Sequence, residues 1–303
     1  MAIEVANAPV SWGALGVAGE VYHYTGDQVL DEIARAGYAG TELGPIGFLG
    51  TNPAALRLAL AQRGLTLTSA FFWADLADAG HRSRTLDDVR HTASLLGEVG
   101  GRWLVLSDYF SPRRLAIAGR VAPDGGDSWT ADQWRAVADT VQAVIEICRP
   151  HGVRVAFHNH AGTSVERPEE LDRLLELGHP DELGLCLDTG HYAYAGGDPA
   201  QAVRRYGARV WHVHLKDISG AIARQASAER IGFMDAVGRG LFVPIGQGVV
   251  RFAEVIAALR AIDYAGWVVV EQDVVADQTG QLTPDPLVSA LASRAYLRER
   301  FGL

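Results

Sequence analysis

The chain has 303 residues, of which 48% are apolar and 21% are charged, so it can build the core of one large domain or two ordinary ones. Its 27 basic and 36 acidic residues give a formal net charge of -9. That charge opposes binding to a nucleic-acid backbone, and no run of Lys or Arg compensates for it locally. We therefore expect a globular protein without a nucleic-acid partner.

The cysteines and the start of the chain bear on its compartment. Only Cys148 and Cys186 are present, in segments that are typical of a helix and a strand, so neither a disulfide framework nor a thiolate metal site is indicated. Residues 1–13 lack a basic region followed by an apolar stretch and a cleavage site, and no window approaches 18 consecutive apolar residues. These features predict a cytoplasmic protein without a membrane anchor.

Apolar, β-rich runs alternate with segments of helical periodicity from one end of the chain to the other. The expected strands are residues 3–8, 40–43, 65–71, 103–107, 154–158, 183–187, 210–214 and 267–271. Helix signals lie between them: Gly37 follows the helical pattern of 27–36, Thr130 and Gln133 form a capping box, and Gly152 ends a long helix.

This alternation predicts the fold class. Eight β/α units with no change of composition favour an α/β protein built as a single (β/α)8 TIM barrel over residues 1–303. A doubly wound sheet is the alternative, but the segment 13–16 is a poor match to the Gly-rich phosphate turn that such a sheet carries. Long loops at about 109–129 and 218–248 follow the fourth and seventh strands. We expect both on the C-terminal face, where barrel active sites lie, as lids or subunit contacts.

Imidazoles and carboxylates gather where the last four expected strands end. They are His158, His160, Glu166, Asp188, His191, His212, His214 and Glu271, and Lys216 lies among them. Such a mixed set suits Mn, Fe, Co or Zn, whereas calcium prefers oxygen ligands alone. Because side chains alternate along a strand, His212 and His214 point the same way, and one of them can reach an ion that Asp188 and Glu271 also reach. Polar residues of a barrel core are the alternative for each residue singly, but four strand ends together favour a metal site.

These motifs also resemble a known family. The segments 188–191 and 212–217, together with Glu271, resemble the sugar phosphate isomerase/epimerase superfamily of xylose-isomerase-like TIM barrels, over the whole chain. The segments 7–13, 42–45, 158–163 and 195–199 are more narrowly similar to its inosose dehydratase branch. The resemblance implies a metal-dependent hydro-lyase of inositol catabolism. Such an enzyme removes water from 2-keto-myo-inositol (scyllo-inosose) and gives a trihydroxycyclohexane-1,2-dione.

The resemblance also implies a set of metal ligands. The superfamily binds its ion through a Glu, an Asp, a His and a Glu after the fifth to eighth strands, which implies Asp188, His214 and Glu271 here. The ion is expected to be Mn or Co, with Mg, Fe or Zn as alternatives. The fifth-strand position holds His158 instead of Glu. Either His158 binds the ion, or it is an acid or base while Glu166 reaches back as the fourth ligand, and we favour Glu166.

Further roles follow from the resemblance. His158 and His160 are expected to transfer protons, and Lys216, the only lysine among the 27 basic residues, to neutralise an enolate oxygen. The alternative for Lys216 is an ion pair with Asp217. Substrate contacts are expected from Trp12, Glu42 and His191, although a packing role for Trp12 is equally consistent with the sequence.

Three other functions are alternatives to a dehydratase. A ketose isomerase or epimerase would use the same metal, but His158 in place of a glutamate mildly favours elimination. A non-catalytic sugar-binding barrel would lack metal ligands, and the sequence retains Asp188, His214 and Glu271. An apurinic endonuclease would need a basic face, which a net charge of -9 disfavours. The resemblance also implies a homo-oligomer.

Overall fold

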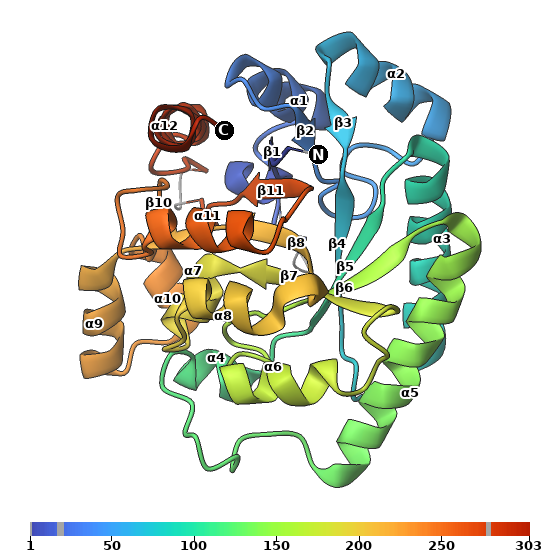
Figure 1. Cartoon of the computed structure of the whole chain (residues 1–303), viewed down its shortest axis with the longest axis vertical. Helices are drawn as coiled ribbons and strands as arrows, with labels where there is room; N and C mark the ends of the chain where they lie inside the picture. Colours follow the sequence, from blue (N-terminus) through green and yellow to red (C-terminus); the bar gives the residue numbers. More distant parts are fainter. Residues whose placement is uncertain (1, 17–20, 277–279) are drawn as a thin grey trace.

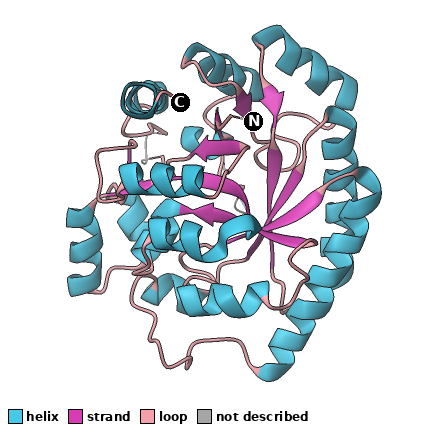
Figure 2. Cartoon of the chain, in the orientation of Figure 1, coloured by secondary structure: helices cyan, strands magenta, loops and turns pink. Residues whose placement is uncertain are grey.

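Parallel strands form the centre of the molecule and helices surround them (Figures 1 and 2). The computed structural model describes residues 2–16, 21–276 and 280–303. One sheet holds its strands in the order β3-β2-β1-β11-β8-β7-β6-β5-β4. These strands are β1 (Glu4–Asn7), β2 (Gly40–Thr41), β3 (Thr66–Leu67), β4 (Ser69–Ala74), β5 (Trp103–Asp108), β6 (Arg154–His158), β7 (Leu183–Asp188), β8 (Val210–Leu215) and β11 (Trp267–Val270).

The two outer members of that order, β3 and β4, are parts of one extended run interrupted at Thr68. The Thr68 N–H donates to the carbonyl of Thr41 in β2, and the Thr68 carbonyl accepts from the N–H of Arg102, which directly precedes β5. The run is therefore bonded to a neighbour on each side, which closes the sheet into a barrel. All eight strands expected from the sequence are present, and the predicted TIM barrel is confirmed.

The helices that alternate with the strands begin and end where the sequence signals them. Thr130 caps the helix after it through a capping box with Gln133, and Gly37 takes a positive φ of 86° just beyond the first helix. The long helices are α1 (Gly26–Arg35), α2 (Pro53–Arg63), α3 (Arg82–Val99), α5 (Ala131–Cys148), α6 (Pro168–Leu175), α8 (Pro199–Tyr206), α11 (Phe252–Ala261) and α12 (Pro286–Phe301). Within the described ranges, no helix combines the length and the hydropathy needed to cross a membrane.

Short elements occupy the connections. The 109–129 connection contains α4 (Pro112–Ile117), and the 218–248 connection contains α9 (Gly220–Glu229) and α10 (Phe233–Gly238). The remaining short elements are the strands β9 (Asp217–Ile218) and β10 (Phe242–Val243), the helix α7 (Thr189–Tyr194), and the 3-10 helices η1 (Pro9–Trp12), η2 (Arg149–His151) and η3 (Gly207–Arg209). Both long loops thus fold into helices beside the carboxyl ends of the strands.

Candidate metal centre and active site

A cavity of about 830 Å³ opens at the carboxyl ends of the strands. Its polar side includes His158, His160, Lys216, Glu271 and Asp273. Parallel strands carry their carboxyl ends to one face of a barrel, which is why residues more than a hundred positions apart meet there. The position of the cavity agrees with the face that the sequence predicts for the site.

Four side chains converge at the floor of this cavity and form what we call the group of four. One ligand atom each from His158, Asp188, His214 and Glu271 lies within 4.8 Å of all the others, and all four residues are buried. Ligands held at about 2.0–2.2 Å from one ion have a similar spread. Among the described residues, both ring nitrogens of His158, Asp188 Oδ2 and His214 Nδ1 are buried without a hydrogen-bond partner. Buried polar atoms are rarely left unpaired, so this donor set fits a divalent cation.

The turn after β7 fixes the orientation of Asp188. Its Oδ1 accepts a hydrogen bond from His191 N at 2.7 Å, which caps α7, while Oδ2 stays directed at the other three side chains. Gly190 allows this turn to lie against β8, because a Cβ there would sit 2.8 Å from Lys216 Cγ. Burial alone would raise the pKa of Asp188, but the charge of Lys216 and the imidazole of His158 outweigh it and hold that pKa well below its usual range.

Lys216 lies among carboxylates instead of pairing with its neighbour Asp217. Its Nζ donates to Asp273 Oδ1 at 2.7 Å and lies 3.1 Å from Glu271 Oε2 and 3.5 Å from Asp188 Oδ2. Burial alone would lower the pKa of Lys216, but these three carboxylates outweigh it and raise that pKa above its ordinary value, so the side chain is an ammonium. Asp217 instead accepts backbone N–H groups of the 246–250 loop, so the alternative ion pair is wrong.

Two further histidines stack beside Lys216. The rings of His160 and His191 have centroids 3.7 Å apart, and His191 Nε2 lies 3.1 Å from Lys216 Nζ. Burial lowers the pKa of both imidazoles well below the usual value, and the positive charge of Lys216 lowers it further, so both rings are neutral. His160 contributes to the cavity lining, whereas His191 is fully buried behind it. The expected direct contact of His191 with substrate is therefore replaced by contact with Lys216.

Glu166 does not join the group of four. Its Oε1 accepts from Gly119 N and its Oε2 from Gly162 N, both at 2.7 Å, so its carboxylate ties the 109–129 connection to the turn after β6. Burial raises the pKa of Glu166 to about 7 despite these two donors. The structure thus groups His158, not Glu166, with Asp188, His214 and Glu271, which favours the alternative in which His158 is the fourth ligand.

The expected substrate contact of Trp12 is also corrected. Trp12 lies in η1, is 2% exposed, and donates from its indole Nε1 to Glu32 Oε2 of α1 at 2.6 Å. Its side chain packs in the core and does not line the cavity. These contacts favour the packing role, because the indole of η1 is bonded to the helix layer at Glu32.

The aromatic wall of the cavity comes from residues that the sequence did not single out. Trp73 at the end of β4 contacts Phe110, with ring centroids 4.9 Å apart, and Phe110 contacts both His160 and Phe233 of α10. The two long loops therefore supply Phe110 and Phe233 to the cavity, as expected of lids. Asp273 is a further site residue that the sequence did not single out, although it lies only two residues beyond Glu271. Burial raises its pKa to about 6, although the charge of Lys216 opposes the shift.

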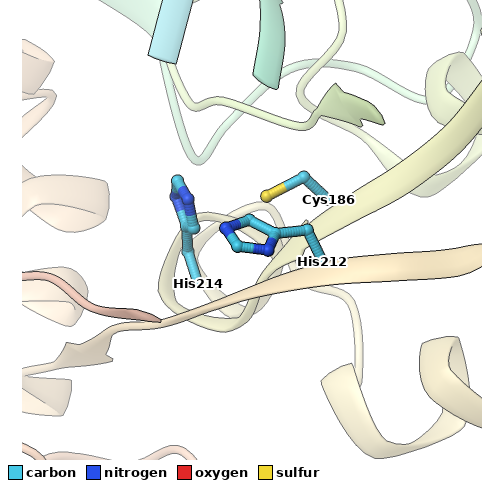
Figure 3. Close-up of side chains that lie close together, drawn as sticks. All are labelled: Cys186, His212 and His214. Carbon is cyan, nitrogen blue, oxygen red and sulfur yellow. The ribbon is translucent and has the colours of Figure 1, made fainter. Parts of the chain in front are cut away.

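Another cluster, formed by Cys186, His212 and His214, shares His214 with the group of four. Figure 3 shows the Cys186 sulfur of β7 directed toward the imidazoles of His212 and His214 on β8. Glu42, which follows β2, lies in the same place, and its Oε1 is 3.0 Å from His212 Nε2 and 2.9 Å from His214 Nε2. Burial raises the pKa of Cys186 to about 12, so its sulfur remains a thiol.

Comparisons with known proteins agree with this architecture. The family model described as "Xylose isomerase-like TIM barrel" matches residues 30–299. An inosose dehydratase of Geobacillus kaustophilus is 34% identical over 88% of this chain and 86% of its own length. The rhizopine catabolism protein MocC of Rhizobium meliloti is also 34% identical, over 93% of this chain and 85% of its own length.

Solved structures share the fold at low sequence identity. The IOLI protein, whose crystal structure contains a bound zinc atom, superposes with a TM-score of 0.71 at 13% identity, over 98% of this chain and 97% of its own. A probable 3-DHS dehydratase, AsbF of Bacillus anthracis, superposes with a TM-score of 0.70 at 17% identity, over 99% of this chain and all of its own. The chain belongs to the xylose isomerase-like TIM barrel family.

Proposed function

We propose that the chain is an inosose dehydratase, a hydro-lyase of inositol catabolism that removes water from scyllo-inosose. The observation that carries this proposal is the group of four buried ligand residues, whose unpaired donor atoms face a cavity large enough for a cyclic polyol. Relatives that bear the name inosose dehydratase, at up to 34% identity over most of the chain, support the same activity. The cavity also suits the substrate, since its polar side can bind hydroxyls and its aromatic wall can cover the C–H face of the ring.

His158, Asp188, His214 and Glu271 would hold one divalent ion in this proposal. Mn or Co fits the mixed nitrogen and oxygen donors, and the zinc of the IOLI protein keeps Zn a candidate. When bound, such an ion would supply Lewis-acid polarisation of the substrate ketone. All four donors lie within one residue of a strand end, so the barrel holds them rigidly.

His160 is the proposed base. Its Nδ1 lies 2.8 Å from the Ala161 carbonyl and donates to it, which leaves the Nε2 lone pair of the neutral ring available to accept the α-proton. Burial keeps this imidazole neutral, because it disfavours the cation. The ring lines the cavity beside the four ligands and stacks on His191, so its position is fixed.

Lys216 is the proposed electrostatic partner of the developing charge. As the α-proton moves to His160, negative charge develops on the ketone oxygen, and a fixed ammonium at the cavity floor stabilises that charge more than the neutral ketone. The electron pair of the broken C–H bond forms the new C=C bond and the neighbouring C–O bond breaks. The proton on His160 then goes to the departing hydroxide, so that one water leaves. The product of this step is the enol of a 1,2-dione, and transfer of its hydroxyl proton to the carbon that lost the hydroxide gives the diketone, so no oxidant or reductant is needed.

Product analysis with scyllo-inosose tests this function. We expect a diketone that appears with one equivalent of water, activity that disappears on chelation, and recovery on addition of Mn or Co. A ketose epimerase would instead return a stereoisomer of its substrate without loss of water. A sugar-binding barrel would bind the polyol and leave it unchanged. His160→Ala should abolish exchange of the α-proton with solvent while the protein still binds the ion.

The wider organisation of the protein is also a proposal. We propose that residues 1–303 act as one domain in the cytoplasm, as a homo-oligomer that acts on a small polyol and has no nucleic-acid or membrane partner. Size-exclusion chromatography with light scattering measures the oligomeric state directly.

A further inference from the structure

We infer that Glu42 is a positioning residue that orients the His214 imidazole for metal binding, and not a substrate-binding residue. The inference rests on the proposed metal site, and it assigns Glu42 a role different from the substrate contact that the sequence suggested. It is carried by the hydrogen bonds of a single carboxylate oxygen.

Glu42 Oε1 receives three donors. Ser69 Oγ donates to it at 2.6 Å, and His214 Nε2 and His212 Nε2 lie 2.9 and 3.0 Å away. Glu42 borders the cavity, but it is only 1% exposed, and its Oε1 is directed at these three partners and not at the open space. A buried carboxylate oxygen with three donors is ionised and fully satisfied, and it can only accept hydrogen bonds.

This acceptor determines which His214 nitrogen carries the proton. Because Glu42 Oε1 accepts, Nε2 of a neutral His214 must be the N–H, and the lone pair is then on Nδ1. His214 Nδ1 is the atom without a hydrogen-bond partner in the described part of the chain, and it lies 3.2 Å from Glu271 Oε2. The lone pair therefore faces the group of four, which is the arrangement of a carboxylate–histidine–metal triad.

Two neighbours hold the triad in place. Ser69 lies on β4 and also contacts His212 Nε2 at 3.2 Å, while His212 lies two residues before His214 on β8. Glu42 thus joins three segments, β2, β4 and β8, below the metal position. Ring rotation of His214 would break its bond to Glu42, so the geometry of the ligand is fixed before an ion binds.

Metal affinity of Glu42→Gln, measured by calorimetry with Mn, Co and Zn, tests the inference. A glutamine can still accept but carries no charge, and loss of such a partner typically weakens metal binding by 10- to 100-fold. We expect that weakening, together with a KM for substrate near the normal value once the protein is saturated with metal. Unchanged metal affinity with a raised KM would overturn the inference and restore the substrate contact.

Glu170→Gln is the matched control. Glu170 is a buried carboxylate that pairs with Arg114 at 2.7 Å and lies outside the group of four, so the same substitution should lower stability and leave metal affinity unchanged. If Glu170→Gln weakens metal binding as much as Glu42→Gln does, the effect is a general loss of stability and the inference fails.

A spectroscopic measurement on the unaltered protein does not depend on the folding of any variant. In zinc-loaded protein with isotope-labelled histidine, long-range nitrogen–proton spectra should show His214 with Nδ1 bound and Nε2 protonated. A zinc-bound Nε2, or a second equivalent of zinc held by Cys186, His212 and His214, would overturn the inference. Protein that binds no divalent ion at all would overturn the proposed function as well.

Discussion

Replacing Lys216 by methionine should separate the electrostatic role of this residue from its structural role. Lys216 Nζ lies within 3.5 Å of oxygens of Asp188, Glu271 and Asp273, so it is the cation nearest to three buried carboxylates. With the three ionised, their charge of -3 is offset by +1 from Lys216 and by +2 from a divalent ion. Methionine fills a similar volume but leaves one charge uncompensated.

Three magnitudes follow from this arrangement. Breaking a buried ion pair costs about 3–5 kcal/mol, so the free energy of unfolding of metal-free Lys216→Met should fall by about that much. The variant site is more negative, and a charge about 4 Å away is worth up to about 4 kcal/mol at an effective dielectric constant of about 20, so metal affinity should rise by about tenfold or more. Turnover should nevertheless fall by roughly ten- to a thousandfold, because the developing oxyanion loses its ammonium.

Urea unfolding with and without metal, metal calorimetry and steady-state turnover measure these three quantities on one preparation. Arg114→Met is the control, since Arg114 makes a buried bidentate pair with Glu170 away from the cavity. It should lose comparable stability with unchanged metal affinity and turnover. Full turnover of metal-saturated Lys216→Met would refute the electrostatic role and leave Lys216 a purely structural residue.

The remaining predictions concern residues that the structure reassigns or newly describes. His158→Ala should lower both metal affinity and turnover by two or more orders of magnitude, whereas Glu166→Gln should keep its metal content in elemental analysis. Burial raises the pKa of Asp108 to about 7, above its unfolded value near 4, so the stabilisation by its neutral form is complete below pH 4 and is lost as the pH rises to about 7. Asp108→Asn should therefore flatten the decline of unfolding free energy between pH 4 and 7 by up to about 1.4 kcal/mol per pH unit. Trp12→Phe should leave the KM unchanged and lower the melting temperature, because the indole bond to Glu32 is lost; a raised KM would return Trp12 to the site.

The barrel could be predicted from the sequence because its strands are buried on both faces. Strands β5 and β7 contain no exposed position, so residues 103–106 and 183–187 appear in the sequence as continuous runs without charged residues and not as alternating ones. Thr68 shows the limit of that signal. Nothing in the pattern of 65–71 marks the residue where the run is interrupted, because the interruption depends on how its two sides pair with β2 and β5.

The grouping of Asp188 and His214 could be predicted for a related reason. Asp188 and His214 are register neighbours on β7 and β8, and chain direction alone carries both to the same face. Glu166 lies eight residues beyond the end of β6, and the direction of its side chain depends on backbone N–H groups, one of them from Gly119, 47 positions away. No local pattern encodes that contact, which is why the sequence did not reveal that the Glu166 carboxylate lies outside the group of four.

The same reasoning explains why the partner of Lys216 was ambiguous in the sequence. Asp217 is adjacent, but successive residues of a strand point to opposite faces, so the adjacent carboxylate is the one that Lys216 is least able to reach. Asp217 instead binds the 246–250 loop, while Asp273 follows the neighbouring strand β11 and faces Lys216 across the barrel rim. Alternation along a strand therefore makes the neighbour in space, not the neighbour in sequence, the partner of a buried charge. In this site it also turns the only lysine of the chain toward the cavity, where a fixed cation can act on the substrate.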